Sequence, residues 1–309
     1  KEGIKPIIGI EAYLHNSDDP EDRSTRQRFH LCLYAKNETG YKNLMYLSSQ
    51  AYLKGFYYYP RINKKLLREH SEGLICSSAC LQGEVNWHLN LSERNRKFGA
   101  GGYEEAKRVA LEYREIFGDD FYLELMRHGI GDQQRIDDDI IRLSLETGIK
   151  IVATNDTHYT FSEDAEAHEA FKCIAMNKEY DDPDRLRHSV HEFYLKSPEE
   201  MAELFADIPE AIENTQEIVR KCNLEIKLGN PTPPNFKFTL MRAEMEGLEL
   251  PEPQKEYSLA NDIVLFEHEA RKGLEERLAH VDRERHDEYR ERLETEIEII
   301  NSMKFPGYM

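Results

Sequence analysis

The sequence predicts an α/β domain built on a mainly parallel sheet or barrel, followed by a mainly helical segment. Short apolar runs alternate with amphipathic stretches over about the first two hundred residues, and such alternation is typical of α/β proteins. A proline-rich stretch, LGNPTPPNFKF at residues 228–238, then interrupts the pattern and reads as a linker. We therefore expect one domain over residues 1–230 and a second region over residues 231–309.

The individual elements follow from apolar periodicity. We expect strands at residues 6–14, 29–35, 73–77, 121–126 and 149–154. Helices are expected between them, at residues 41–53, 103–117, 133–146 and 165–175, and two more begin at Pro198 and Pro209, where proline is tolerated in a first turn. Beyond the linker we expect helices at residues 267–281 and 283–303; one face of the second carries Tyr289, Leu293, Ile297 and Ile300.

The composition is strongly acidic, with 41 lysines and arginines against 59 aspartates and glutamates and a formal charge of −18. A basic patch is the usual mark of a nucleic-acid binder, so a protein of this composition would hold DNA mostly through other regions. Five scattered cysteines indicate a reducing, cytoplasmic location rather than a disulfide framework. No apolar run reaches the roughly 18 residues that span a membrane, and we expect both chain ends to be truncations.

Five side chains that can bind metal lie at or near predicted strand ends. Glu11 is an acidic residue inside an apolar strand, where an unpaired carboxylate costs several kcal/mol and calls for a cation or a hydrogen-bond donor. His30 and Cys80 adjoin two further strands, and Asp156 and His158 follow the strand at residues 149–154. Carboxylate, imidazole and thiolate together suit zinc, with manganese or iron possible where oxygen ligands dominate.

Each of these residues also has an ordinary structural interpretation. Residues i and i+2 of an extended chain point to the same side, so Asp156 and His158 can converge on one ion, but Asp156 could equally cap a turn or helix. Glu11 could pair with an arginine, and Cys80 could be a small buried apolar residue. Spacing alone thus leaves both a metal site and simple packing open.

The wording of the motifs is more specific than their spacing. The segments KPIIGIEAYL, FHLCLYAKNETGYKNLMYLSSQAYLKGFYYYPRI, GLICSSACLQGEV, FYLELMRHGI, TNDTHY, DAEAHEAFKCI and CNLEIKLG occur in order between residue 1 and about residue 230. Together they closely resemble the alpha subunits of bacterial DNA polymerase III, the replicative C-family polymerases. The resemblance resumes at ERLETEIEIINSMKFPGYM, which is similar to the segment that leads into the polymerase palm.

The resemblance implies a PHP (polymerase and histidinol phosphatase) domain, a distorted β/α barrel whose first strands are missing here. Its metal-binding members use nine ligands, and Glu11, His30, Cys80, Asp156 and His158 match the last five. It further implies zinc or manganese at this site, perhaps serving 3′–5′ exonuclease proofreading, and magnesium at a palm site outside this chain. No catalytic residue for polymerisation is expected here. Arg61 could contact substrate phosphate or simply form a surface ion pair, and His128 and His168 are expected to support or pack rather than ligate.

Implied partners are primer–template DNA and deoxynucleoside triphosphates through regions outside this chain, and the sliding clamp, proofreading subunit and clamp-loader components of the holoenzyme. Two alternative functions are compatible with the same predicted metal ligands. A stand-alone PHP-type phosphoesterase should end soon after its last barrel helix, whereas this chain continues into a linker and more helices. A catalytically silent PHP platform would differ only in metal content and in activity at that site.

Overall fold

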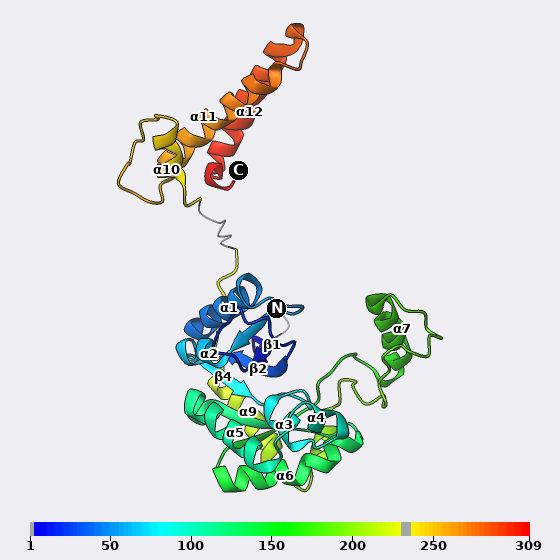
Figure 1. Ribbon diagram of the computed structural model, residues 1–309. Helices are drawn as coiled ribbons and strands as arrows, with labels where there is room; N and C mark the ends of the chain where they lie inside the picture. The colour runs from blue at the N-terminus through cyan, green and yellow to red at the C-terminus, as the bar shows by residue number, and fades with distance from the viewer. Residues whose placement is uncertain (1–2, 230–235) are drawn as a thin grey trace. The chain divides into compact units, whose positions relative to one another are not determined.

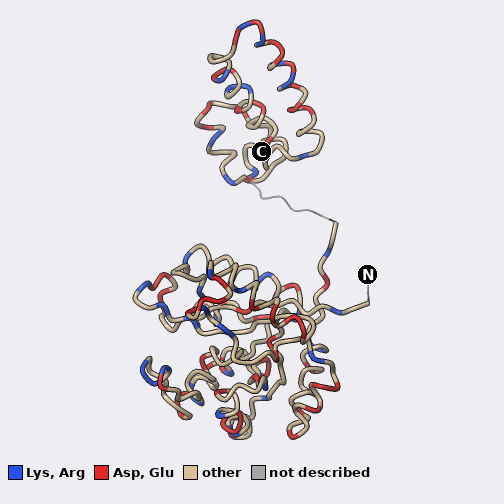
Figure 2. The backbone as a smooth tube through the Cα atoms, turned by 90° about the vertical axis from the view of Figure 1, so that its right-hand side faces the viewer, with Lys and Arg blue, Asp and Glu red and all other residues tan. Residues whose placement is uncertain are grey.

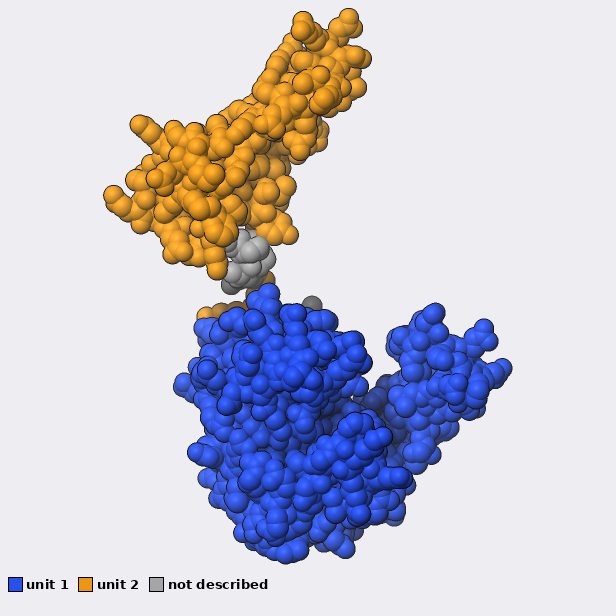
Figure 3. Space-filling model, in the orientation of Figure 1, with its two compact units in different colours: residues 1–226 blue, residues 227–309 orange. Residues whose placement is uncertain are grey.

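The computed structural model describes residues 3–229 and 236–309. The chain forms two compact units, residues 1–226 and residues 227–309 (Figure 3). Most of the predicted linker, residues 230–235, lies outside the described residues. Among those described, none of the helices combines the length and apolarity that crossing a membrane requires.

The first unit is organised around one six-stranded mixed sheet. Its strand order is β3-β1-β2-β4-β5-β6. The strands are β1 (Gly9–His15), β2 (Phe29–Ala35), β3 (Arg61–Asn63), β4 (Leu74–Ser77), β5 (Phe121–Met126) and β6 (Lys150–Thr154). β1 pairs with β3, β4 with β5, and β5 with β6 in parallel, whereas β2 runs antiparallel to both β1 and β4.

All five predicted strands are present, with shifts at their ends. Sequence reasoning missed β3, because three residues reading Arg-Ile-Asn are too short and too polar to show a strand pattern. It also did not foresee the reversed direction of β2, which leaves the parallel pairings in two separate groups. Neither difference changes the fold class: an α/β unit followed by a mainly helical segment, as predicted.

Most helices of the first unit pack their apolar stripes on this sheet (Figure 1), and the helix at residues 165–176 contributes no residue to its core. α5 shows the principle, because its buried positions Ala106, Val109, Ala110, Tyr113 and Phe117 recur at helical spacing. The helices are α1 (Glu38–Leu53), α2 (Lys64–Glu69), α3 (Glu84–Leu89), α4 (Glu93–Lys97), α5 (Tyr103–Phe117), α6 (Gly131–Thr147), α7 (Ala165–Met176), α8 (Pro198–Leu204) and α9 (Pro209–Lys221). As predicted, Pro198 and Pro209 are the first residues of α8 and α9.

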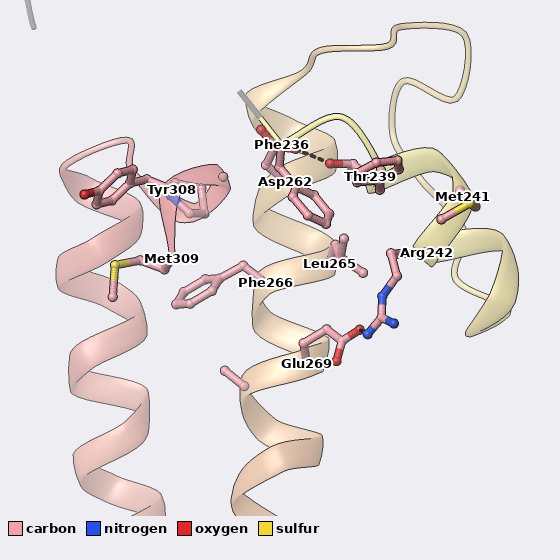
Figure 4. Close-up of a pocket in the computed structure, with 14 residues that line it drawn as sticks. Phe236, Thr239, Met241, Arg242, Asp262, Leu265, Phe266, Glu269, Tyr308 and Met309 are labelled. Atoms are coloured by element: carbon pink, nitrogen blue, oxygen red, sulfur yellow. Dashed lines mark hydrogen bonds and ion pairs between the residues drawn. The ribbon is translucent and has the colours of Figure 1, made fainter. Parts of the chain in front are cut away.

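The second unit consists of α10 (Thr239–Met245), α11 (Leu259–Leu278) and α12 (His286–Ser302). α11 begins eight residues before the predicted helix, because Ser258 caps it by accepting a hydrogen bond from the Asn261 amide. The predicted face of α12 is correct, since Ile297 is buried. α10, α11 and the C-terminal turn line an open, largely apolar pocket of about 650 Å³ (Figure 4).

Candidate metal centre

Pairing between β1 and β2 places two predicted ligands side by side. In this register Tyr13 lies opposite His30 and Glu11 lies opposite Cys32, so Glu11 and His30 are diagonal neighbours on one face of the sheet. Nδ1 of His30 lies 2.5 Å from Oε1 of Glu11. The hydrogen bond from His30 lowers the pKa of Glu11, which is therefore a carboxylate at neutral pH.

A tight loop after β4 brings Cys80 to the same point. Ala79 has a φ of +59°, which turns the chain sharply just before Cys80. Sγ of Cys80 lies 3.6 Å from Nδ1 of His30. One ligand atom from each of Glu11, His30 and Cys80 lies within 4.8 Å of the other two. Burial raises the pKa of the Cys80 thiol to about 12, so this sulfur carries its proton unless a cation replaces it.

Main-chain contacts fix the Cys80 loop against β2. The amide of His30 donates to the carbonyl of Gln82, and the amide of Gly83 donates to the carbonyl of Cys80. Asn86 on α3 donates from its side chain to the Cys80 carbonyl at 3.2 Å. Gly83 is required here, because a Cβ at this position would lie 1.8 Å from the carbonyl oxygen of Ser78.

Asp156 and His158 lie outside this group of three. Their charges nevertheless act on it, since His158 helps to lower the pKa of Glu11 and Asp156 helps to raise that of Cys80. The prediction assumed an extended chain after β6, but Asp156 has a φ of +43°, which breaks the alternation of side chains. Nδ1 of His158 instead lies 2.6 Å from the main-chain oxygen of Asp156 and 3.9 Å from its Oδ1. Three of the five predicted ligands therefore converge, and convergence of this pair remains a prediction.

Arg61 occupies a different position from the one its predicted role needs. It is 1% exposed, and its NH1 atom donates to the carbonyl oxygens of Thr25 at 2.7 Å and Gln27 at 3.4 Å. Its NH2 atom donates to the carbonyl of Asp22. The guanidinium thus holds the loop between β1 and β2, which argues against the predicted contact with substrate phosphate.

Sequence reasoning overlooked Glu124, a fully buried carboxyl on β5. Its two oxygens accept hydrogen bonds from the hydroxyls of Ser77 and Thr154. Burial raises the pKa of Glu124 despite these bonds, and the charge of Asp156 adds to the effect. Glu124 and Cys80 line the same small cavity. The signal was available, because an acidic residue inside an apolar strand is what singled out Glu11.

Histidines around the Asp156 loop support it, as predicted for His128. His128 is fully buried, and its Nε2 atom donates to the carbonyl of Asn155 at 2.7 Å while Gln133 bonds its Nδ1. This contact anchors the main chain one residue before Asp156. His128 also stacks on Phe193, with ring centroids 4.5 Å apart.

A second group of metal-competent side chains comprises His168, Glu169 and His188. Glu169 is already engaged by two cations, because Lys172 and Arg185 lie 2.9 Å and 2.6 Å from its oxygens. A metal ion would be repelled by both of these neighbours. This group is therefore better explained as the packed interior of the α7 segment, in keeping with the packing role expected for His168.

Comparison with known proteins gives a consistent family assignment. The PHP domain family matches residues 1–128, in keeping with a distorted β/α barrel. A DNA polymerase III subunit alpha of Campylobacter jejuni is 71% identical over this whole chain, which corresponds to 26% of that protein. The proteins of the same name from Helicobacter pylori (strain J99) and Treponema pallidum are 65% and 38% identical over 100% and 99% of this chain, and it covers 25% and 24% of them. The chain spans about a quarter of the length of these curated relatives, and it belongs to the family of bacterial DNA polymerase III alpha subunits.

Proposed function

We propose that this chain is the metal-binding PHP region of the catalytic alpha subunit of a bacterial replicative DNA polymerase, and that its first unit serves metal-dependent phosphodiester hydrolysis. The observation that carries the proposal is the convergence of Glu11, His30 and Cys80 within 4.8 Å. Family membership favours 3′–5′ removal of nucleotides, in which water adds to phosphorus and the bond from phosphorus to the 3′ oxygen of the preceding nucleotide breaks.

The donor set fits a divalent cation. A carboxylate, an imidazole and a thiol are the ligands that zinc accepts, and manganese is the alternative if Asp156 and further oxygen ligands join. When bound, such a cation polarises a phosphate and lowers the pKa of a coordinated water. His30 is central to the set, since its Nδ1 lies 2.5 Å from Glu11 and 3.6 Å from Cys80. A bound cation would take the place of the thiol proton of Cys80 and would compete with the hydrogen bond between His30 and Glu11.

Other parts of the proposal rest on family membership alone. Template-directed synthesis would use magnesium, primer–template DNA and deoxynucleoside triphosphates at a palm site beyond these residues. The sliding clamp, the proofreading subunit and the clamp loader would be the holoenzyme partners, in the cytoplasm.

A second function is favoured by one feature of the same site. The hydrogen bond between His30 and Glu11 gives both side chains a partner without a metal, and Asp156 and His158 stand outside the group of three. Both are what a PHP region kept as a structural platform would show. Metal content decides between the two functions.

The test uses the full-length alpha subunit and its Cys80→Ala variant. Elemental analysis of the purified wild-type protein should show bound zinc or manganese, and Cys80→Ala should lose most of it together with hydrolysis of single-stranded DNA. Asp156→Asn should lower both as well, because the aspartate charge offsets that of the cation.

The matched control is Cys173→Ala, which removes a buried thiol from α7 without touching the site. Primer extension should be unchanged in all three variants, since it takes place elsewhere in the alpha subunit. Metal-free wild-type protein would replace the hydrolytic function with the structural platform, whereas full metal content in Cys80→Ala would show that Cys80 holds no metal and would overturn the proposed site.

A further inference from the structure

A cluster of aromatic and arginine side chains adjoins the candidate metal centre. It comprises Tyr13, Arg26, Arg28, Tyr58 and Tyr59, and we call it the tyrosine–arginine platform. The guanidinium of Arg26 lies 3.7 Å from the ring centroid of Tyr58, and that of Arg28 lies 3.7 Å from the centroid of Tyr59. Tyr58 and Tyr59 are 54% and 39% exposed, so solvent reaches both rings.

Direct ring contacts connect this platform to a predicted metal ligand. Tyr13 is the cross-strand partner of His30, and their ring centroids are 5.2 Å apart. The next contact outward joins Tyr13 to Tyr59, with centroids 5.4 Å apart. A molecule lying on Tyr59 would therefore be two side chains away from the imidazole of His30.

The arginines retain hydrogen-bonding capacity for a ligand. Within the described part of the chain, neither Arg26 nor Arg28 forms an ion pair with a carboxylate. Stacking on a tyrosine face uses the flat side of a guanidinium and leaves in-plane N–H groups for phosphate oxygens. Arg26 donates from one of its terminal nitrogens to the Tyr58 hydroxyl, and its other N–H groups form no ion pair in the described residues. The nearby acidic residues Asp19 and Asp22 direct carboxylate oxygens at main-chain amides of their own loop.

Both supporting segments are held in fixed conformations. Tyr58 has a φ of +62°, a strained conformation for a side chain of this size. The amide of Tyr57 donates to the carbonyl of Tyr59, which closes this turn. Buried Arg61 holds the opposite loop through the carbonyls of Thr25 and Gln27. The platform is thus preformed, and a ligand that uses it would not have to order it.

We propose that the tyrosine–arginine platform binds an unpaired end of single-stranded DNA and guides it towards the metal centre. This inference rests on the proposed hydrolytic function and adds the surface that selects its substrate. Exposed rings stack on bases whose faces are accessible, which a duplex does not offer. Arg26 and Arg28 supply local positive charge for phosphates on a chain whose net charge of −18 disfavours a long duplex.

A photocrosslinking experiment tests the platform without relying on hydrolysis. The full-length alpha subunit is first saturated with primer–template DNA to occupy the polymerase site. A single-stranded oligodeoxynucleotide containing 5-iodouracil is then added and irradiated, and the crosslinked peptides are mapped by mass spectrometry. The peptide carrying Tyr58 and Tyr59 should be labelled, and a blunt duplex containing the same base should label it far less.

Variants distinguish stacking from general effects. Tyr59→Ala and Arg28→Ala should each lower crosslinking and affinity for the oligonucleotide about tenfold, the size expected for losing one stacked base. Tyr59→Phe keeps the ring and should behave as wild type. Tyr52→Ala removes a tyrosine of α1 that is 63% exposed and outside the platform, and should also have no effect.

The outcomes separate this inference from the function on which it rests. If crosslinks mapped only to other regions, or if Tyr59→Ala kept its affinity for the oligonucleotide, DNA binding by the tyrosine–arginine platform would be ruled out, whatever the metal content. Crosslinking at Tyr58 and Tyr59 in a protein that holds no metal would retain the platform and remove the hydrolytic function.

Discussion

The two units of this chain are stabilised in different ways. The first unit surrounds its sheet with a large cluster of buried apolar side chains that reaches from β1 to α9. In the described part of the second unit, the buried apolar side chains are Ala243, Leu265, Leu278, Ile297 and Pro306. Its helices instead carry many charged residues of both signs along their lengths (Figure 2).

Exposed ion pairs connect α11 and α12 in the second unit. Arg271 on α11 lies 2.8 Å from Glu294 on α12, and Arg290 on α12 lies 2.9 Å from Glu275 on α11. Such pairs contribute little in water, and Phe236 and Phe266 line the pocket shown in Figure 4. The candidate metal centre is thus supported by a large apolar core, whereas the described part of the second unit has few buried apolar side chains to stabilise it.

The largest expected effect comes from the core of the first unit. Leu123 on β5 is fully buried between two neighbouring strands. Leu123→Ala should lower the free energy of unfolding of this unit by about 4 kcal/mol, through lost transfer energy and a cavity that the sheet cannot close. Leu278→Ala in the second unit should cost about 2 kcal/mol, because fewer side chains lose a contact there.

Trp87 allows unfolding of the first unit to be measured separately from unfolding of the second. It is the single tryptophan and lies on α3, against Phe29 of the first unit. Denaturant unfolding followed by tryptophan fluorescence therefore reports the first unit, while far-ultraviolet circular dichroism reports the helices of both. If Leu123→Ala and Leu278→Ala lowered the free energy of unfolding equally, the second unit would have a core comparable to that of the first, and the proposed difference between the units would be wrong.

Sequence patterns predicted the frame of the first unit better than its site. Apolar runs such as FYLELM locate a strand because burial on both faces leaves little choice of residue type. The convergence of Glu11 and His30 required the register of two strands, which no local pattern encodes. The positive φ at Asp156 and the burial of Arg61 are likewise consequences of tertiary contacts. For His30 and Cys80, resemblance to a known family rather than spacing favoured metal binding over simple packing, and their role as ligands stays a prediction.

A buried ion pair in the first unit should have an intermediate effect. Glu169 is 5% exposed and binds Arg185 at 2.6 Å and Lys172 at 2.9 Å. Glu169→Gln leaves Arg185, itself 7% exposed, without its counter-charge, and should destabilise the α7 segment by about 3 kcal/mol. Hydrogen exchange at the amides of α7 is the measurement, because the opening is local. The control is Asp182→Asn on the same segment, because this carboxylate is 25% exposed and pairs with Lys178 at 2.8 Å. It should change exchange little.

The same carboxylate gives this segment a defined response to acid. Burial raises the pKa of Glu169, but hydrogen bonds from Lys172 and Arg185 outweigh it and lower the pKa to about 2. A depressed carboxylate pKa contributes stability above the unfolded value of about 4.3 and loses it as the pH falls towards 2. Protection of α7 should therefore decline over this range in the wild type and stay flat in Glu169→Gln. A parallel decline in both proteins would assign the acid response to other groups.

The smallest effect should come from the second unit's exposed ion pairs. Arg271 contacts Glu267 on its own helix at 2.9 Å and Glu294 on α12 at 2.8 Å, and its side chain is 47% exposed. Water and salt screen such charges, so Arg271→Ala should lower the stability of this unit by less than about 1 kcal/mol. The stability of the second unit is measured from the circular dichroism change that occurs without a change in Trp87 fluorescence. The loss of stability should be smaller at high salt than at low salt. A salt-insensitive loss as large as that of Leu278→Ala would mean that the aliphatic part of Arg271 packs as core. The second unit would then be held by burial, as the first is, and the contrast between the two would be one of degree.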